Sequence, residues 1–337
     1  MRHLLLRAAR LLVMQEDILL GGQAVLEGVM MRSPHSMAVA VRRPGGDIAV
    51  LRQKILALAD MHPVLRWPVL RGAVVMVQAL VLGFKSLNFS AEAALEETRE
   101  GTPLAASGGE PAAAAPDSPK KSSANSWAIL GSMAVALALG FGLFFVLPLA
   151  LTRLAQPYIA ALENSIVFNL VDGLIRIAVF LAYLAGISFL KEIRRVFEYH
   201  GAEHKTVHAH EAGLPLTVEN VRTRSRLHPR CGTSFLLVVM VVSILAFSFL
   251  PTDIPFYLMI FPRLALVPLI AGLSYEAIRF SAKRLHKPFW RAVVGPGLWL
   301  QLVTTQEPSD DQIAVAIRAL EEALAMEKAG GPEVVPA

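Results

Sequence analysis

Cysteine is almost absent from the sequence, because the 337 residues include only Cys231. A single cysteine excludes a disulfide within the chain and leaves the thiol available as a metal ligand. Charge is also scarce: 18% of the residues are charged, whereas 54% are hydrophobic. A soluble domain rarely combines these two fractions, so the composition indicates a membrane protein.

Several common functional motifs are missing. The Gly21-Gly22 pair opens no G-x-G-x-x-G or Walker pattern, and no Ser, His and Asp arrangement suggests a triad. A basic loop carries arginines without interleaved aromatic residues, so we expect it to contact lipid phosphates or solvent, and we expect no nucleic-acid partner. These arginines are Arg222, Arg224, Arg226 and Arg230.

Long apolar runs are abundant instead. A helix needs about 20 apolar residues to cross roughly 30 Å of hydrocarbon. Four runs approach or exceed this length: Ala128–Leu151, Ser165–Leu190, Ser234–Leu250 and Phe256–Ile278. A fifth run, Val69–Phe89, is interrupted by Arg71, Gly72, Gln78 and Lys85. We predict four transmembrane helices and, at residues 69–91, one interfacial or re-entrant helix.

Positive charge alternates between the two sides of these spans. Residues 1–68 contain nine Lys or Arg and residues 191–233 contain eight, whereas the connections 152–164 and 251–255 contain only Arg153. Positive residues mark the cytoplasmic side of a multi-pass membrane protein, so both termini and residues 191–233 are expected in the cytoplasm.

The segment before the first apolar run indicates strands. Gly21–Arg32 is a glycine-bounded apolar run of strand-like length, and Met37–Arg42 and Asp47–Leu51 flank Pro44-Gly45-Gly46 as in a hairpin. Near the other terminus, Ser309 and Gln312 match a capping box at the start of an amphipathic helix. Its apolar stripe consists of Ile313, Ile317, Leu320 and Leu324.

The predicted fold class is therefore an all-α polytopic membrane protein with a small β-rich cytoplasmic element at its N-terminus. From the N-terminus, we expect a cytoplasmic element with a β-hairpin (1–68), the interfacial or re-entrant helix (69–91) and a flexible linker (92–126). Transmembrane helices one and two (127–190) follow, and then a cytoplasmic His-rich segment (191–233). Transmembrane helices three and four (234–279) lead to a cytoplasmic C-terminal region with the amphipathic helix (280–337).

The His-rich segment carries the sharpest chemical signal. His200-x-x-Glu203-His204 places two imidazoles on one helix face with a carboxylate beside them, a spacing found in zinc hydrolases, where the Glu is the general base. His200, His204, His208 and Glu211 fall within an arc of about 80°. They extend over about 16 Å, so at most two of them, one turn apart, would share a metal.

Further ligands must then come from another segment. His228 and Cys231 precede the third span, and imidazole with thiolate favours zinc. Glu27 and Glu276 are more distant candidates. The alternative interpretation is that these side chains are only solvated or hydrogen-bonded near a membrane surface.

A second polar cluster lies within the second span. Asn169, Asp172 and Arg176 share one helix face. Ionisable groups in hydrocarbon are costly, so Asp172 and Arg176 either neutralise each other or line a polar path for a substrate.

Four stretches of this sequence resemble the YqhQ family of bacterial membrane proteins. They are GGQAVLEGVMMR, FEYHGAEHKTVHAHE, HPRCGTSF and GLWLQLVTTQEPSDDQIAVAI. Members of that family are described as uncharacterised or as predicted metal-dependent enzymes. The resemblance implies the candidate site residues Glu198, His200, Glu203, His204, His228 and Cys231, with Gln23 and Glu27 as lower-ranked partners.

These observations lead to three functional hypotheses. The first is a zinc-dependent hydrolase at the cytoplasmic face, acting on a membrane-associated substrate, with Glu203 or Glu198 as general base. The second is a channel, transporter or lipid-moving protein whose His-rich segment is structural or regulatory. The third is a membrane scaffold. The expected partners are membrane lipids and a second copy of the chain, since small residues such as Gly140 and Gly186 permit close helix packing.

Overall fold

The computed structural model describes residues 20–56, 62–95, 123–229, 231–282, 284 and 287–329. They divide into two compact units. The first takes residues from Met1–Glu97, Leu184–Val239 and Pro268–Ala337, and the second from Thr98–Tyr183 and Met240–Val267. Residues 1–19 and most of the expected linker, residues 96–122, lie outside the described part of the chain.

The N-terminal element is a four-stranded antiparallel sheet, as the sequence predicted in kind. Its strands, in chain and spatial order, are β1 (Gly21–Val25), β2 (Gly28–Arg32), β3 (Ser36–Arg42) and β4 (Ile48–Lys54). The expected hairpin around Pro44-Gly45-Gly46 is confirmed, with Gly46 at a φ of 92°. The single strand expected at Gly21–Arg32 is wrong, because the chain turns there at Leu26-Glu27 and Glu27 adopts a φ of 53°.

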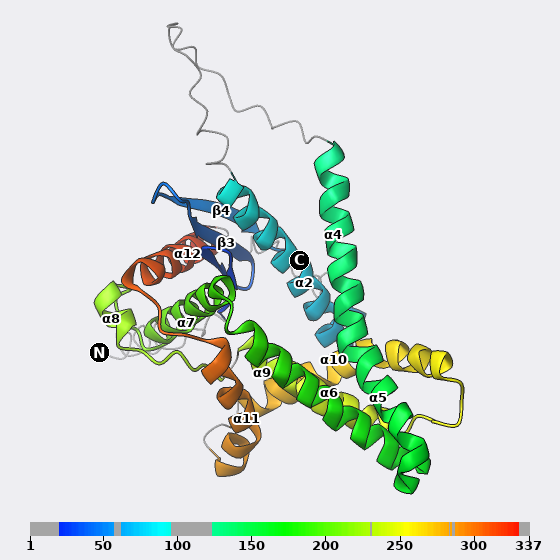
Figure 1. The fold of residues 1–337 in the computed structure, drawn as a ribbon. Coiled ribbons are helices and arrows are strands. Elements are labelled where there is room, and N and C mark those ends of the chain that lie inside the picture. The colour runs from blue at the N-terminus through cyan, green and yellow to red at the C-terminus, as the bar shows by residue number, and fades with distance from the viewer. Residues whose placement is uncertain are drawn as a thin grey trace, which may run out of the picture. The chain divides into compact units, whose positions relative to one another are not determined.

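The sheet is covered on both faces. Along β3, Met37, Val39 and Val41 point to one face, and the alternate residues Ala38 and Ala40 point to the other. The first face packs against the apolar side of α2 (Leu70–Leu95), and the second packs against α7 and α12. Figure 1 shows α7 and α12 beside this sheet.

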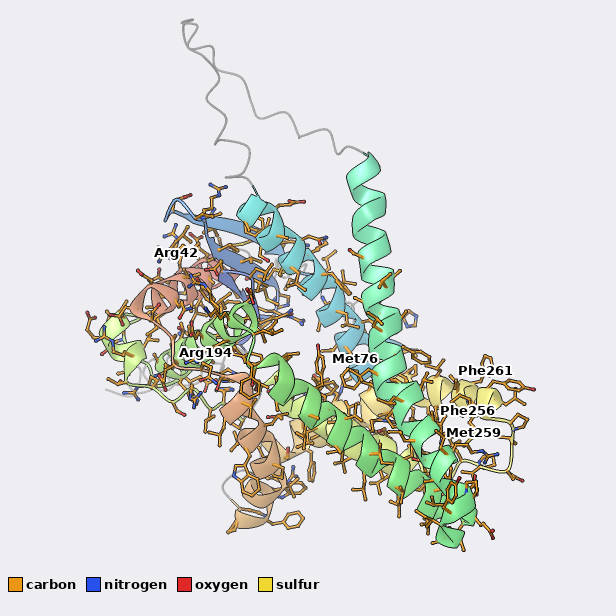
Figure 2. All side chains as sticks on the ribbon, in the orientation of Figure 1. Arg42, Met76, Arg194, Phe256, Met259 and Phe261 are labelled. Carbon is orange, nitrogen blue, oxygen red and sulfur yellow. The ribbon has the colours of Figure 1, made fainter. Side chains whose placement is uncertain are left out.

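A single core joins the sheet to two helices that are distant in sequence. These are α7 (Lys191–Glu211), which follows the second predicted span, and α12 (Asp310–Ala329), with the short α8 (Val218–Arg222) beside them. The predicted capping box is confirmed, since the backbone N–H of Gln312 donates to Ser309 Oγ and that of Ser309 donates to Gln312 Oε1. The predicted apolar stripe of α12 is buried in this core. Arg42 donates to the carbonyl of Asp311 at its start (Figure 2).

The remaining helices are mostly apolar. In chain order they are η2 (Pro63–Arg66), α4 (Ser123–Phe141), the π-helical turn η3 (Gly142–Val146), α5 (Leu147–Ala155), η4 (Gln156–Tyr158), η5 (Ala160–Glu163), α6 (Ser165–Ile187), α9 (Gly232–Phe247), η6 (Phe256–Met259), α10 (Ile260–Ala282) and α11 (Pro288–Thr304). In the second unit, Leu149, Leu162, Phe168 and Met259 form a small core; Met259 is labelled in Figure 2.

Four helical stretches in the described part of the chain are long and apolar enough to cross a membrane: Leu70–Ala94, Ala134–Tyr158, Ser165–Ile187 and Phe256–Ser281. The fold class of a polytopic helical membrane protein with a small N-terminal sheet is confirmed. These four candidates, judged by length and composition, are not the same four segments as the predicted spans. α2, expected at the interface, has the length of a span, whereas α9 is a shorter apolar helix. The α9 helix ends early because Pro251 follows its last turn.

One helix was missed by the sequence analysis. Residues 280–337 were expected to contain a single amphipathic helix, but α11 precedes it. Pro296 inside α11, flanked by Gly295 and Gly297, breaks the pattern expected of a helix. At Gly297 an added Cβ would meet Ser234 Oγ at 2.7 Å, so this glycine permits the close approach of α9.

Candidate metal centre

The candidate ligands lie on α7 and on the turn that precedes α9. In α7, Gly201 stands between two of the histidines. A Cβ at this position would overlap the backbone carbonyl oxygen of Gln306, so the glycine lets the segment before α12 cross close to the helix. On the turn, the backbone N–H of Cys231 donates to the carbonyl of His228 at 3.3 Å, which brings these two residues close together.

The first group of ligand atoms comes from His200, His204 and Cys231, and these atoms all lie within 4.8 Å of one another. His200 Nε2 is 3.2 Å from Cys231 Sγ. Tetrahedral zinc with Zn–N of about 2.0 Å and Zn–S of about 2.3 Å requires ligand atoms about 3.3–3.6 Å apart. The predicted convergence of the α7 imidazoles and the thiol before α9 is therefore confirmed.

The second group comes from His208, Glu211 and His228, whose ligand atoms also lie within 4.8 Å of one another. His228 Nε2 is 3.4 Å from Glu211 Oε2. The two groups are neighbours, since the rings of His204 and His228 have centroids 5.7 Å apart. His228, predicted to complete a shell with His200 and His204, therefore lies instead in the group formed by the next turns of α7.

Three of the imidazoles are oriented by backbone carbonyl groups. His200 Nδ1 donates to Thr304 at 2.8 Å, His204 Nδ1 donates to Arg226 at 2.5 Å and His208 Nε2 donates to Leu227 at 2.9 Å. Each bond fixes the proton on one ring nitrogen and leaves the other nitrogen for the ligand groups. Metal-ligating histidines are held in the same way in known metal sites.

Burial disfavours the charged form of two of these rings. It lowers the pKa of His204 and of His208, in each case against the raising effect of neighbouring acceptors. A metal binds neutral imidazole, so a depressed pKa removes the competition with a proton at neutral pH. The arrangement therefore fits the donor state that a metal ion requires.

Glu203 lies between the ligands and the sheet. Its side chain is buried, and Oε2 is 3.4 Å from His204 Nε2. Burial raises the pKa of Glu203, while His200 and His228 oppose the shift. A Cβ on Gly22 of β1 would lie 2.5 Å from Glu203 Cγ, so the absence of a side chain at Gly22 is what gives Glu203 its space.

Glu198, the predicted alternative general base, and three lower-ranked candidates lie outside both groups. Glu198 accepts a hydrogen bond from Gln312 Nε2 at 3.0 Å, at the capping box of α12. Glu27 pairs with Arg195, and Glu276 pairs with Arg71. The side chain of Gln23 lies beside Gly83 of α2, because Gln23 and Gly22 point to opposite faces of β1. Glu198, Glu27 and Glu276 therefore bind side chains of other elements, and Gln23 packs against α2.

The polar cluster in α6 is buried within the second unit. Arg176 donates to Asp172 Oδ2 at 2.8 Å, and its guanidinium also lies over the ring of Phe247. Asn169 accepts a hydrogen bond from Arg263 at 2.6 Å. Asp172 is 0% and Arg176 is 5% exposed, so the pair that the sequence predicted on one helix face is formed and enclosed.

Sequence reasoning missed two parts of the site. Gln301 of α11 holds both backbone groups of His228, at 2.8 Å each, and nothing in its local sequence marks this role. A cavity of about 410 Å³ opens beside the second group and is lined by His208, Glu211, Ala212, Thr223, Arg224 and Ser225. The position of Glu211 on the histidine face of α7 was the one available signal for this part.

Fold and site together define a polytopic helical membrane protein with two adjacent groups of metal-type donors next to a small sheet. The family described as "Protein of unknown function (DUF1385)" matches residues 67–326. The protein named "Uncharacterized protein YqhQ" of Bacillus subtilis (strain 168) is 36% identical over 311 residues, which are 91% of this chain and 92% of that protein. The chain belongs to this DUF1385 family, which confirms the resemblance to YqhQ. No solved structure matches the chain.

Proposed function

We propose that this protein is a zinc-dependent hydrolase of the bacterial inner membrane, with its metal centre on the cytoplasmic side. The observation that carries the proposal is the first ligand group. His200, His204 and Cys231 converge from two segments, and both imidazoles are already oriented by backbone carbonyls. Two imidazoles and a thiolate suit zinc better than magnesium or calcium.

The three donors leave a fourth tetrahedral position, which is the arrangement of catalytic rather than structural zinc sites. A bound zinc ion supplies Lewis acidity that makes water a better nucleophile at neutral pH. Glu203 is placed to accept the proton of that water, because its carboxylate lies beside His204 Nε2. Glu198 is held by Gln312 at the start of α12, which favours Glu203 over Glu198 as the general base.

A membrane-associated substrate is supported by the position of the ligands along the chain. Cys231 directly precedes α9, the apolar helix that begins at Gly232. The centre therefore lies where an apolar helix starts, within reach of groups at the membrane surface. The alternative of a transporter depends on Asp172 and Arg176 facing water, and their mutual ion pair and burial favour a structural role.

The cytoplasmic orientation is supported by the positive charge of residues 1–68 and 191–233, and the shared core of the first unit is consistent with it. The sheet, α7 and α12 pack together, so residues 20–56, 191–229 and 305–329 belong on one side of the membrane. The chain must then cross an even number of times between them. One pair of crossings by α4–α5 and α6, and another by α9 and α10, meets this condition, with α2 remaining at the interface as predicted.

Metal content tests the site. Full-length protein purified in detergent should contain stoichiometric zinc, and Cys231→Ser and His204→Ala should each lose it. His210→Ala is the matched control, because His210 lies on the same helix but in neither ligand group. Glu203→Gln should retain zinc and lose hydrolysis of p-nitrophenyl phosphate or ester probes, whereas Glu198→Gln should keep both. Stable wild-type protein that binds no zinc would contradict the proposal.

Cysteine labelling of intact cells tests the orientation. A membrane-impermeant maleimide should label Tyr158→Cys, in the connection between α5 and α6, where the native side chain is 88% exposed. It should not label Leu56→Cys or Glu219→Cys until the membrane is permeabilised, since both positions adjoin the unit that carries the metal centre. Labelling of Leu56→Cys and Glu219→Cys from outside, with Tyr158→Cys protected, would overturn the cytoplasmic orientation.

A further inference from the structure

The second group of donors is independent of the first. It uses His208 and Glu211 on the last turns of α7, together with His228 from the turn before α9. We propose that this group is a second metal-binding site, and that its open side faces a cavity that receives an oxyanion. The inference rests on the proposed function for its reaction, but its ligands and its cavity are separate.

The second group is held in place as firmly as the first. His208 Nε2 donates to the carbonyl of Leu227 at 2.9 Å, which leaves Nδ1 as the ring nitrogen that carries no proton. The backbone of His228 is fixed from both sides by Gln301, whose Oε1 accepts from its N–H and whose Nε2 donates to its carbonyl. Such supporting bonds are typical of metal ligands, whose affinity depends on orientation.

The donor types of the two groups differ. The first contains a thiolate, whereas the second contains two imidazoles and a carboxylate. Two histidines with one carboxylate bind zinc and also manganese(II) or iron(II), and they leave several coordination positions open. The second site is therefore expected to hold a first-row divalent cation with exchangeable positions.

The cavity of about 410 Å³ lies on the open side of this group. His208 and Glu211 form one wall, and Arg224 forms another. The Nε of Arg224 is buried and accounts for no hydrogen bond among the described residues. The positive charge of Arg224 in the lining of this cavity, next to a cation site, suits a phosphate or carboxylate group of a substrate.

Glu203 links the two groups. Its buried carboxylate lies 3.4 Å from Nε2 of His204 in the first group, and the ring of His204 lies 5.7 Å, centroid to centroid, from that of His228 in the second. One proton acceptor would therefore serve both sites, while the cavity at the second site holds the anionic part of the substrate. Two-metal phosphatases and nucleases likewise place two divalent ions close together at one phosphoester group.

Cobalt(II) titration of the metal-free, full-length protein in detergent tests the second site directly. Two equivalents should bind. One should give a thiolate-to-cobalt charge-transfer band in the near ultraviolet, and the other should add only d–d absorption. The double variant His208→Gln/Glu211→Gln should lose the second equivalent and keep the charge-transfer band, and Cys231→Ser should show the opposite pattern. The matched control His210→Gln/Glu219→Gln should bind two equivalents.

The outcomes separate the two proposals. One equivalent with the charge-transfer band would overturn the second site and leave the first. One equivalent without the band would support the second site and overturn the zinc centre at Cys231. No cobalt binding at all would overturn both. Since the wild-type titration alone distinguishes these cases, the test does not depend on the variants folding.

Phosphate binding tests the cavity. Inorganic phosphate should change the d–d absorption of the second cobalt ion without altering the thiolate band, and Arg224→Gln should weaken phosphate binding by about tenfold or more. Glycerol 3-phosphate, which carries a lipid headgroup without its chains, should bind more tightly than phosphate if the natural ligand is a lipid. Equal phosphate binding by Arg224→Gln would overturn the oxyanion cavity.

Discussion

Gly22 of the N-terminal sheet lies against Glu203 of the candidate centre, and the substitution Gly22→Ala tests this contact. A Cβ at this position would lie 2.5 Å from Cγ and 2.8 Å from Cδ of Glu203. Carbon atoms in contact are normally about 3.5–4.0 Å apart, so either β1 or the Glu203 side chain must move by about 1 Å. Both are packed in the first unit, so neither can relax freely.

The expected cost follows from this overlap. Overpacking a well-filled interior costs about 1–3 kcal/mol, which corresponds to a fall in melting temperature of about 2–10 °C for a domain of this size. If the cost comes from Glu203, then Gly22→Ala should cost less than about 0.5 kcal/mol in a Glu203→Ala background. The coupling between the two substitutions should therefore be 1 kcal/mol or more, as an order of magnitude.

Thermal unfolding of the four proteins of this cycle, in detergent and with a chelator present, measures the coupling without a contribution from bound metal. Gly21→Ala is the matched control, because a Cβ on Gly21 would meet nothing within 4 Å. It should leave the melting temperature nearly unchanged. An equal loss of stability from Gly22→Ala with and without the Glu203 side chain would refute the reasoning.

Four further outcomes are expected. The hydrogen bond from Arg52 lowers the pKa of Glu322 in the folded protein. The contribution of this ion pair to folding stability is present above the unfolded pKa of Glu322 and is lost as the pH falls through the folded pKa. Glu322→Gln should therefore lower the melting temperature by about 2 °C at neutral pH and by less in acid. If Asp172 and Arg176 form a structural pair that does not serve transport, Asp172→Asn or Arg176→Met alone should destabilise the protein by about 3–5 kcal/mol in thermal unfolding, because each leaves one buried charge without its partner. The double variant should be destabilised by less than either single variant. Gly201→Ala should cost about 1–3 kcal/mol in the same assay, because its Cβ would overlap a backbone carbonyl. Chelation should remove about 4 kcal/mol if zinc had been present at roughly a thousandfold its dissociation constant, and an unchanged melting temperature would count against a bound metal.

The first ligand group was predictable because its constraints are local. The spacing of His200 and His204 puts both rings on one face of any helix, and Cys231 directly precedes an apolar run that needs to start at the membrane. His200, His204 and Cys231 all belong to the segment between the second and third predicted spans. They therefore lie on the same side of the membrane, where they can meet. The capping box at Ser309 was equally local, because it needs only four consecutive residues.

Other features depended on contacts that no local pattern encodes. The assignment of His228 to the second group depends on the turn that joins it to Cys231. The face of β1 that carries Gly22, and not Gln23, toward Glu203 is set by the register of the sheet. α11 was missed because Pro296 argues against a helix, although tertiary packing tolerates it there.

The orientation of the candidate ligands shows why a short His and Glu motif predicts so little by itself. The groups that hold the three α7 imidazoles are backbone carbonyls of Arg226, Leu227 and Thr304. Any residue type supplies a carbonyl, so these positions carry no chemical signature in the sequence. What selects them is the path of the chain: the loop after α8 and the end of α11 both pass along α7, one on the way into α9 and the other on the way to α12. Spacing along α7 thus determines which donors share a face, whereas the paths of these two segments determine which nitrogen of each ring is left for a metal.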